Sequence, residues 1–233
     1  MTPNLVVANL EHELLELAPE RASERATGEC EEVLFVLTGR GVLRIAGTDH
    51  ALEPESGAYL APAESYELRN ERDEALRLIS VRIPDPAPPA QTPDAAAVNR
   101  TVVRRLVDQQ ARGATTDREF RIVADPSTGL RSATQFVGYI PVAKAPDHFH
   151  TYDEVIYVLD GEGVFHAHGE DRELAPGATV ELPARTVHCL ENTGAQTMRV
   201  LGVFRPAGSP AAAYYPDGTP AHADAPALDT AEI

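Results

Sequence analysis

The chain has 233 residues, which is enough for one large domain or two small ones. Hydrophobic residues make up 43% of it, an ordinary share for a globular protein, so the composition excludes a disordered chain. The net charge of −16 repels phosphate backbones and anionic lipid headgroups, which argues against nucleic acid or a membrane surface as a partner.

The cellular compartment is inferred from three features that the sequence lacks: a membrane-spanning helix, a secretory peptide and a disulfide framework. No apolar run reaches the roughly 18–20 residues of a membrane-spanning helix. Acidic residues interrupt the N-terminal stretch where a secretory peptide would be apolar. Two cysteines, Cys30 and Cys189, are too few for a disulfide framework. We therefore expect a cytoplasmic protein.

Short apolar runs separated by glycine and proline predict an all-β fold with little helix. The runs at residues 34–37, 78–81, 155–159 and 200–204 are rich in β-branched and aromatic side chains, which is typical of buried strands. One segment, Val102–Gln110, has apolar residues at helical spacing. It fits either an amphipathic helix or a strand followed by a turn.

Two segments lack the large apolar residues of a core. Residues 84–97 are rich in proline and alanine, and the chain beyond Pro216 is rich in proline, alanine, aspartate and glycine. We therefore expect an N-terminal domain over residues 1–83, an extended linker over 84–100, a second domain over 101–212 and a loose tail over 213–233.

The two predicted domains contain an internal repeat. Residues 32–42 align with residues 154–164 without a gap at an offset of 122, and seven of the eleven positions are identical. The repeat predicts a duplicated β-unit, in which the shared Gly-x-Gly forms a hairpin turn. Alternation after that turn directs Leu43, Ile45, Phe165 and Ala167 to the core and Arg44, His166 and His168 outward.

The second repeat carries a set of metal-binding side chains. His148 and His150 are two residues apart and share a face in an extended chain, and Glu154 follows four residues later. A third histidine, His188, begins another predicted strand. Three imidazoles and one carboxylate suit a divalent first-row metal and leave positions for water or substrate.

These residues resemble the two sequence motifs of the bicupin family. The first motif, G-x5-H-x-H-x3,4-E-x6-G, lacks its leading glycine, which is Val142 here, and is otherwise matched by His148, His150, Glu154 and Gly161. The second, G-x5-P-x-G-x2-H-x3-N, has Arg185 at its middle glycine and is otherwise matched by Gly177, Pro183, His188 and Asn192. The resemblance implies two tandem jelly-roll-like β-barrels.

The resemblance also implies a cofactor. It predicts one divalent transition metal per chain (Mn, Fe, Ni, Co, Cu or Zn), with the ligands His148, His150, Glu154 and His188. In the first repeat the positions of His148 and His150 align with Ala26 and Gly28, and that of His188 falls at about Tyr66–Glu67. We therefore expect no metal there, and interpret Glu32 as a surface or hydrogen-bonded carboxylate.

Other polar residues are interpreted as structural. His166 and His168 fit exposed histidines, and Cys189 fits a buried thiol on the strand face opposite His188. Four polar residues near the predicted metal strands are candidates for orienting a substrate, although each alone fits a structural role: Arg131, Gln135, Tyr152 and Tyr157.

The first functional hypothesis is a metal-dependent enzyme acting on a small oxygenated organic molecule, a dioxygenase similar to quercetinase-like bicupins, with Glu154 as a base. A non-redox isomerase, lyase or hydrolase is the second. Ureidoglycine aminohydrolase has a similar architecture but another ligand order, and oxalate decarboxylases usually carry a metal set in both halves. A non-enzymatic ligand-binding bicupin is the third. We expect a small-molecule substrate and a possible homodimer as partners.

Overall fold

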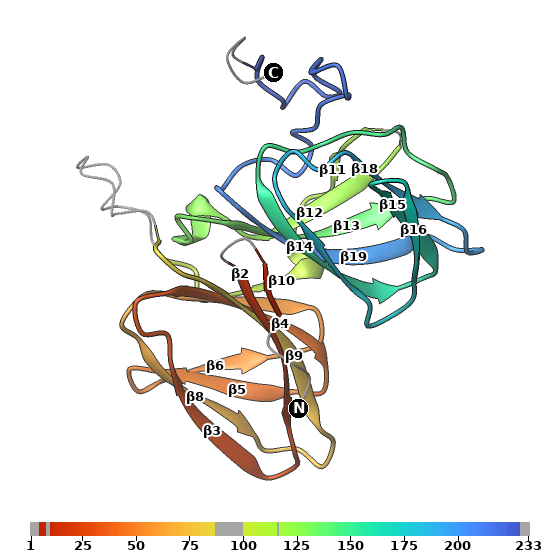
Figure 1. Cartoon of the computed structure of the whole chain (residues 1–233). Coiled ribbons are helices and arrows are strands. Elements are labelled where there is room, and N and C mark those ends of the chain that lie inside the picture. The colour runs from red at the N-terminus through yellow and green to blue at the C-terminus, as the bar shows by residue number, and fades with distance from the viewer. Residues whose placement is uncertain (1–4, 8–9, 87–99, 116, 229–233) are drawn as a thin grey trace. The chain divides into compact units, whose positions relative to one another are not determined.

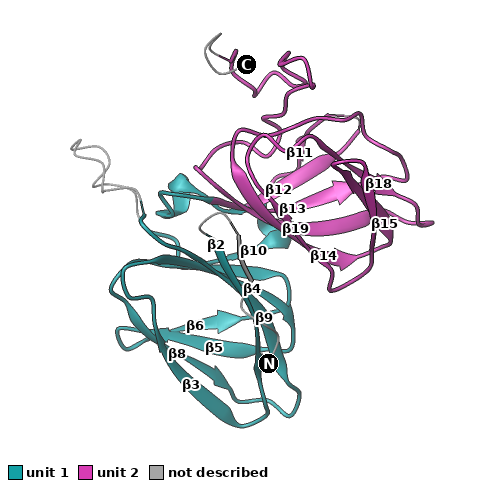
Figure 2. Cartoon of the chain, in the orientation of Figure 1, with its two compact units in different colours: residues 1–109, 123–133 teal, residues 110–122, 134–233 magenta. Residues whose placement is uncertain are grey.

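The computed structural model describes residues 5–7, 10–86, 100–115 and 117–228, and its ordered elements are almost all β-strands (Figure 1). The all-β prediction is therefore confirmed. The chain divides into two compact units (Figure 2). The first contains residues 1–109 and 123–133, and the second contains residues 110–122 and 134–233. No helix in the described part of the chain has the length and apolar character needed to cross a bilayer.

The first unit consists of two antiparallel sheets. One sheet has the spatial order β1 (Leu5–Val7), β2 (Leu10–Leu17), β9 (Leu76–Ile83), β4 (Glu31–Thr38), β7 (Ser56–Leu60) and β10 (Val103–Arg105). The other has the order β3 (Arg21–Ala26), β8 (Ser65–Asn70), β5 (Gly41–Ile45) and β6 (Thr48–Leu52). Alternate side chains of both sheets form one apolar core that includes Leu34, Leu43 and Leu78, while Arg44 is exposed as predicted.

The second unit repeats this arrangement. Its larger sheet has the order β11 (Arg112–Gly113), β12 (Glu119–Ala124), β13 (Thr134–Ile140), β19 (Met198–Arg205), β14 (Asp153–Asp160) and β17 (Thr179–Leu182). Its smaller sheet has the order β16 (Glu170–Leu174), β15 (Gly163–Ala167) and β18 (His188–Asn192). The core of this unit includes Ile156, Val180 and Val200, with Phe165 packed against it.

The predicted duplication extends to irregular features of the backbone. The pairing of β4 with β9 shifts register between Val36 and Thr38, and the pairing of β14 with β19 shifts between Val158 and Asp160, which are the same places at the offset of 122. Such β-bulges are specific features of a fold rather than chance defects. The two units are therefore copies of one barrel.

A buried asparagine also recurs in both units. The Asn192 Nδ2 donates to the carbonyls of Ile140 and Gln196, and its Oδ1 accepts from the Gly194 amide, all at 2.8–3.0 Å. Asn70, at the equivalent position in β8, makes the same three kinds of bond with Leu17, Glu74 and Arg72. The motif asparagine therefore ties its strand to a neighbouring strand and to the following turn.

The segment with helical spacing forms a strand and a turn. Residues 103–105 are β10, which pairs with β7, and Leu106–Asp108 is a single 3-10 turn. The Leu106 amide donates to the Glu55 carbonyl at 2.8 Å, and the side chain of Leu106 is buried while that of Val107 is 62% exposed. Sheet pairing therefore overrides the helical spacing, and the second of the two interpretations is the correct one.

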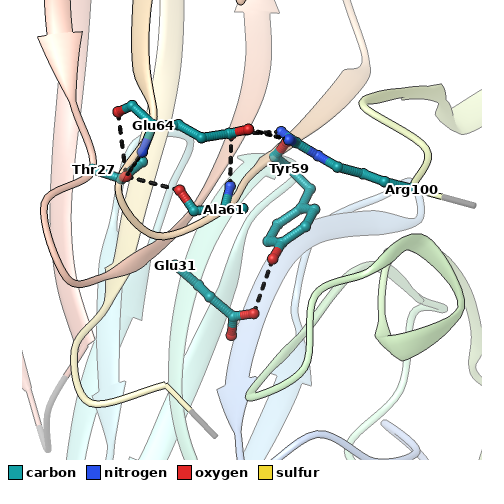
Figure 3. Close-up of polar contacts among 6 residues, drawn as sticks. All are labelled: Thr27, Glu31, Tyr59, Ala61, Glu64 and Arg100. Atoms are coloured by element: carbon teal, nitrogen blue, oxygen red, sulfur yellow. Dashed lines mark hydrogen bonds and ion pairs between the residues drawn. The ribbon is translucent and has the colours of Figure 1, made fainter. Parts of the chain in front are cut away.

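The unit boundary lies later in the chain than the sequence predicts. Most of the predicted linker lies at 87–99, outside the described residues. Arg100 then forms an ion pair with Glu64 and donates to the Tyr59 carbonyl at 2.8 Å (Figure 3). The fully buried Glu31 accepts from the Tyr59 hydroxyl and from the Ser132 amide, both at 3.0 Å. These polar contacts hold parts of the predicted second domain in the first unit.

The predicted loose tail packs against the second unit as far as it is described. Phe149 and Tyr214 exchange backbone hydrogen bonds of 2.9 and 3.0 Å, and their rings stack with centroids 5.4 Å apart. Tyr214 is 1% exposed, and its hydroxyl donates to the Pro226 carbonyl at 2.8 Å. One buried aromatic residue thus anchors a segment whose composition resembles a linker.

Candidate metal site of the second unit

Three of the four predicted metal ligands form a cluster. His148, which precedes β14, pairs through its backbone with His188, the first residue of β18. His150 lies two residues further on, and the three ring centroids are 4.5–5.3 Å apart. One nitrogen from each ring can be chosen so that all three lie within 4.8 Å of one another. The structure therefore brings the three imidazoles to one place, as predicted.

Each imidazole is oriented by a backbone carbonyl. The Nδ1 atoms of His148, His150 and His188 lie 2.9 Å from the carbonyl oxygens of Pro146, Ala212 and Thr186, respectively. A carbonyl oxygen only accepts hydrogen bonds, so each Nδ1 carries the proton and each Nε2 keeps its lone pair. Metal-binding histidines are oriented by such partners.

Burial keeps these histidines uncharged. It lowers the pKa of His148, lowers that of His150 well below its ordinary value, and lowers that of His188 to about 3. The positive charge of Arg118 lowers all three further. Three neutral imidazoles with fixed tautomers match the nitrogen ligands of a divalent first-row metal. The residues present therefore fit the predicted cofactor.

The fourth predicted ligand, Glu154, lies in the same cavity but outside the group of three nitrogens. Its side chain is buried, and burial raises its pKa to about 8. It lies over Gly202 of β19, where an added Cβ would be 2.8 Å from the Glu154 Oε1 and 2.3 Å from the Cε1 of Phe136. The missing side chain of Gly202 thus makes room for both the carboxylate and the ring.

The cavity is small and mostly apolar. It has a volume of about 80 Å³ and is lined by the three histidines, Glu154 and apolar residues such as Phe136 and Leu190. Tyr152 also lines it, with its ring stacked on His150 at 4.6 Å and on Phe204 at 3.9 Å. Burial raises the pKa of Tyr152 well above its ordinary value, so the phenol stays neutral. Of the four candidates for orienting a substrate, Tyr152 is thus in the cavity.

The other three candidates are not among the residues that line the cavity. Arg131 belongs to the first unit, where its Nε lies 3.5 Å from the Oε1 of Glu31. Gln135 is fully buried, and Tyr157 is half-buried on β14. Their polarity near the metal strands was the only signal for a role in binding, and polarity alone does not say which face of a strand a side chain occupies.

The interpretation of His168 and of Cys189 agrees with the structure, whereas the expectation that His166 is exposed is wrong, because two carboxylates cover its ring. His168 is exposed, and His166 is half-buried between Asp171 and Glu191, with nitrogen–oxygen distances of 2.6 and 3.0 Å. Cys189 is fully buried, and its thiol donates to the Ala145 carbonyl at 3.0 Å. None of these side chains lines the cavity.

The motif glycine that is replaced by Arg185 occupies a turn with a left-handed backbone. Arg185 has a φ of 66°, and Ala63, at the equivalent place in the first unit, has a φ of 62°. Glycine adopts this conformation without strain, which explains the residue type in the motif. The turn forms here with other side chains, so the departure from the motif does not displace His188.

The first unit holds an arginine where the second holds its first histidine. The sequence alignment matched His148 with Ala26, but the strand register places Arg25 opposite Tyr66, as His148 lies opposite His188. The alignment, which runs back from Glu32 and Glu154, was one residue off because the segment between Arg25 and Glu32 is one residue longer than the segment between His148 and Glu154. The Arg25 Nε donates to the Tyr66 hydroxyl at 3.0 Å, and its Nη2 donates to Glu13 at 2.8 Å.

Glu32, the counterpart of Glu154, is a buried hydrogen-bonded carboxylate. Its Oε1 accepts from the Tyr66 hydroxyl at 2.9 Å and from the Ser80 hydroxyl at 2.6 Å. Ser80 occupies the position of Gly202, because Ser80 pairs with Leu34 of β4 as Gly202 pairs with Ile156 of β14, at the repeat offset of 122. The first unit therefore replaces the histidine cluster by a closed network of arginine, tyrosine, serine and carboxylate.

The sequence analysis missed one charged residue of the cavity. The hairpin between β11 and β12 brings Arg118 to the cavity wall, where its Nη2 donates to the Leu190 carbonyl at 2.5 Å. No motif includes this position, and its distance from the histidines in the sequence is 30 residues or more. Only the strand pairing reveals it.

Comparisons with known proteins agree with this architecture. Residues 135–204 match the family model described as a cupin domain. A comparison with curated proteins found no match. Similar solved structures include a putative glyoxylate-induced protein from Pseudomonas aeruginosa, with 22% identity, a TM-score of 0.67 and coverage of 84% of this chain and 74% of that one.

Two further structures have 15% identity. AerE from Microcystis aeruginosa has a TM-score of 0.70, with 84% of this chain and 88% of that one covered. A variant of Bacillus subtilis oxalate decarboxylase has a TM-score of 0.64, with 84% and 69% covered. At these identities the likeness establishes the fold. The second unit is therefore a cupin domain, and the chain as a whole has the two-barrel fold of the bicupins.

Proposed function

We propose that the second unit is a metal-dependent enzyme site for a small oxygenated organic molecule, with His148, His150, His188 and Glu154 as the metal ligands. The observation that carries this proposal is a cluster of three imidazoles, with one nitrogen of each ring within 4.8 Å of the others, whose Nδ1 atoms all bond to carbonyls, because each Nε2 then keeps a lone pair for a metal. A surface or storage role has no need for such an arrangement.

A divalent metal in this position supplies Lewis-acid polarisation of a substrate oxygen and, where the ion is redox-active, electron transfer to O2. The chain itself does three things. The carbonyls of Pro146, Ala212 and Thr186 hold the rings in one orientation. The apolar residues of the wall, such as Phe136 and Leu190, surround the space for the substrate. When Glu154 is not bound to the metal, burial raises the pKa of its carboxyl to about 8, so that the carboxyl can exchange a proton near neutral pH and act as the base.

Two reaction types suit this site. The first is the dioxygenase reaction that the resemblance implies. The second is a non-redox isomerisation, elimination or hydrolysis, and the position of Glu154 in the cavity outside the group of three nitrogens favours it, because such reactions depend on a carboxyl that can transfer a proton. The cavity of about 80 Å³ suits a substrate, or a reacting part of one, with a few non-hydrogen atoms. Oxygen consumption during turnover distinguishes them, since the non-redox reaction proceeds without O2.

Metal analysis of protein purified without chelators tests the proposal. We expect close to one equivalent of a divalent transition metal in the wild type and its loss in His188→Ala. The matched control is His168→Asn, because His168 is exposed, lies outside the cavity and has a φ of 54°, which asparagine tolerates. A wild-type protein with no more metal than His188→Ala would contradict the proposal.

A further inference from the structure

The cavity of the second unit contains an arginine without an acidic partner. Arg118 lines the cavity and is half-buried, and its Nη2 donates a hydrogen bond to the backbone carbonyl of Leu190. Among the residues that the structure describes, no carboxylate lies within ion-pair distance of its guanidinium. Most arginines of this chain, such as Arg25, Arg69 and Arg199, do have such a partner.

An unpaired guanidinium in a cavity wall is costly unless it meets an anion. Desolvation disfavours the charged form, and burial lowers the pKa of Arg118 for this reason. The guanidinium carries five N–H donors in a fixed fork, and the Leu190 carbonyl accepts from one of its nitrogens. The geometry of the remaining donors matches a carboxylate, which can accept two of them side by side.

The charges around the cavity support an anionic ligand. The protein has a net charge of −16, so its overall field repels anions and any anion that binds needs a local cation. Arg118 is the arginine among the residues that line the cavity, and none of these lining residues is a lysine. Arg118 is therefore the positive side chain of this wall, and Glu119 of the lining is an exposed residue at its rim.

We propose that Arg118 forms a carboxylate-binding subsite, so that the cavity takes a small organic acid whose second oxygen lies at the histidine cluster. This inference rests on the proposed function and adds the substrate class to it. An α-hydroxy or α-oxo acid has both groups on adjacent carbons, and its few non-hydrogen atoms suit a cavity of about 80 Å³. The carboxylate binds the guanidinium, and the adjacent oxygen faces the imidazoles.

Calorimetric titration with glycolate tests the subsite, and ethylene glycol is the uncharged comparison. Both Mn²⁺-loaded and chelator-treated full-length protein are titrated. We expect the wild type to bind glycolate at least about tenfold more tightly than ethylene glycol, since a charge-assisted bidentate pair contributes that much. Arg118→Gln should lose this preference, and Arg118→Lys should keep part of it. Arg172→Gln, which changes an exposed arginine of β16, should bind as the wild type does.

Metal content measured on the same samples separates this inference from the proposed function. Arg118→Gln that keeps its metal but binds glycolate as tightly as the wild type would overturn the subsite alone. A wild type that binds glycolate no better than ethylene glycol would overturn it as well. If the wild type holds no metal, the proposed function fails. The subsite is then decided by the chelator-treated protein, in which Arg118→Gln should still weaken glycolate binding.

Discussion

Gly202 offers a sharp test of how the cavity wall is packed. In Gly202→Ala the new Cβ would lie 2.3 and 2.5 Å from two carbons of the Phe136 ring and 2.8 Å from the Glu154 Oε1. The ring cannot move freely, because it packs edge-on against Phe120 and Phe204 at 6.4 and 5.9 Å. Overpacking of this kind costs up to about 3 kcal/mol, and the reduced freedom of the unfolded chain returns at most about 1 kcal/mol.

We therefore expect Gly202→Ala to lower the free energy of unfolding by about 2 kcal/mol, measured by urea denaturation with circular dichroism. Gly138→Ala is the matched control, since its new Cβ would meet Val200 at 3.2 Å and the same Phe136 ring at 3.4 Å. That variant should stay within about 1 kcal/mol of the wild type. Adding Phe136→Leu to Gly202→Ala should recover about 1 kcal/mol relative to the sum of the single changes.

The reasoning is refuted if Gly202→Ala proves as stable as Gly138→Ala. It is also refuted if the two substitutions, Gly202→Ala and Phe136→Leu, are simply additive, because the clash is then not between these residues. A change in metal affinity of Gly202→Ala would show, in addition, that the displaced carboxylate of Glu154 had contributed to binding.

Two further substitutions test the network of the first unit and the C-terminal segment of the second. Tyr66→Phe removes a hydroxyl that donates to the buried Glu32, and should lower the free energy of unfolding by about 1–3 kcal/mol. An unchanged midpoint of urea denaturation would contradict the role of the network. Tyr214→Ala removes a buried ring, which should lower the free energy of unfolding by about 3–5 kcal/mol. It also frees the segment whose Ala212 carbonyl orients His150, so metal affinity should fall about 10–100-fold. The neighbouring Tyr215, which is 39% exposed, provides the control Tyr215→Ala, and equal effects of the two changes would refute the anchoring role of Tyr214.

The regular parts of the fold were predictable because they have local signals. The Gly-x-Gly hairpins and the alternation after them indicate strands, register and core faces, so the places of Leu43 and Ile45 in the core followed from the sequence. The histidine cluster was also predictable. His148 and His150 share a face at short range, and His188 falls within a second motif of fixed spacing.

The remaining parts depend on pairing between distant segments, for which the sequence carries no local signal. The alignment placed Ala26 against His148, and only the register opposite Tyr66 shows that Arg25 takes that place. Arg118 reaches the cavity through a short hairpin that belongs to no motif. Tyr214 is one aromatic residue in a segment rich in alanine and proline, so composition concealed its anchoring contact with Phe149.

The shared β-bulge and the recurring asparagine have a practical consequence for handling the protein. The first unit builds both features around an arginine rather than a histidine cluster, so this type of barrel closes through its own side chains. We therefore expect the second barrel to fold without an ion. Removing and adding different cations can then be carried out on folded protein, so the metal preference of the proposed site can be tested by exchange instead of by refolding.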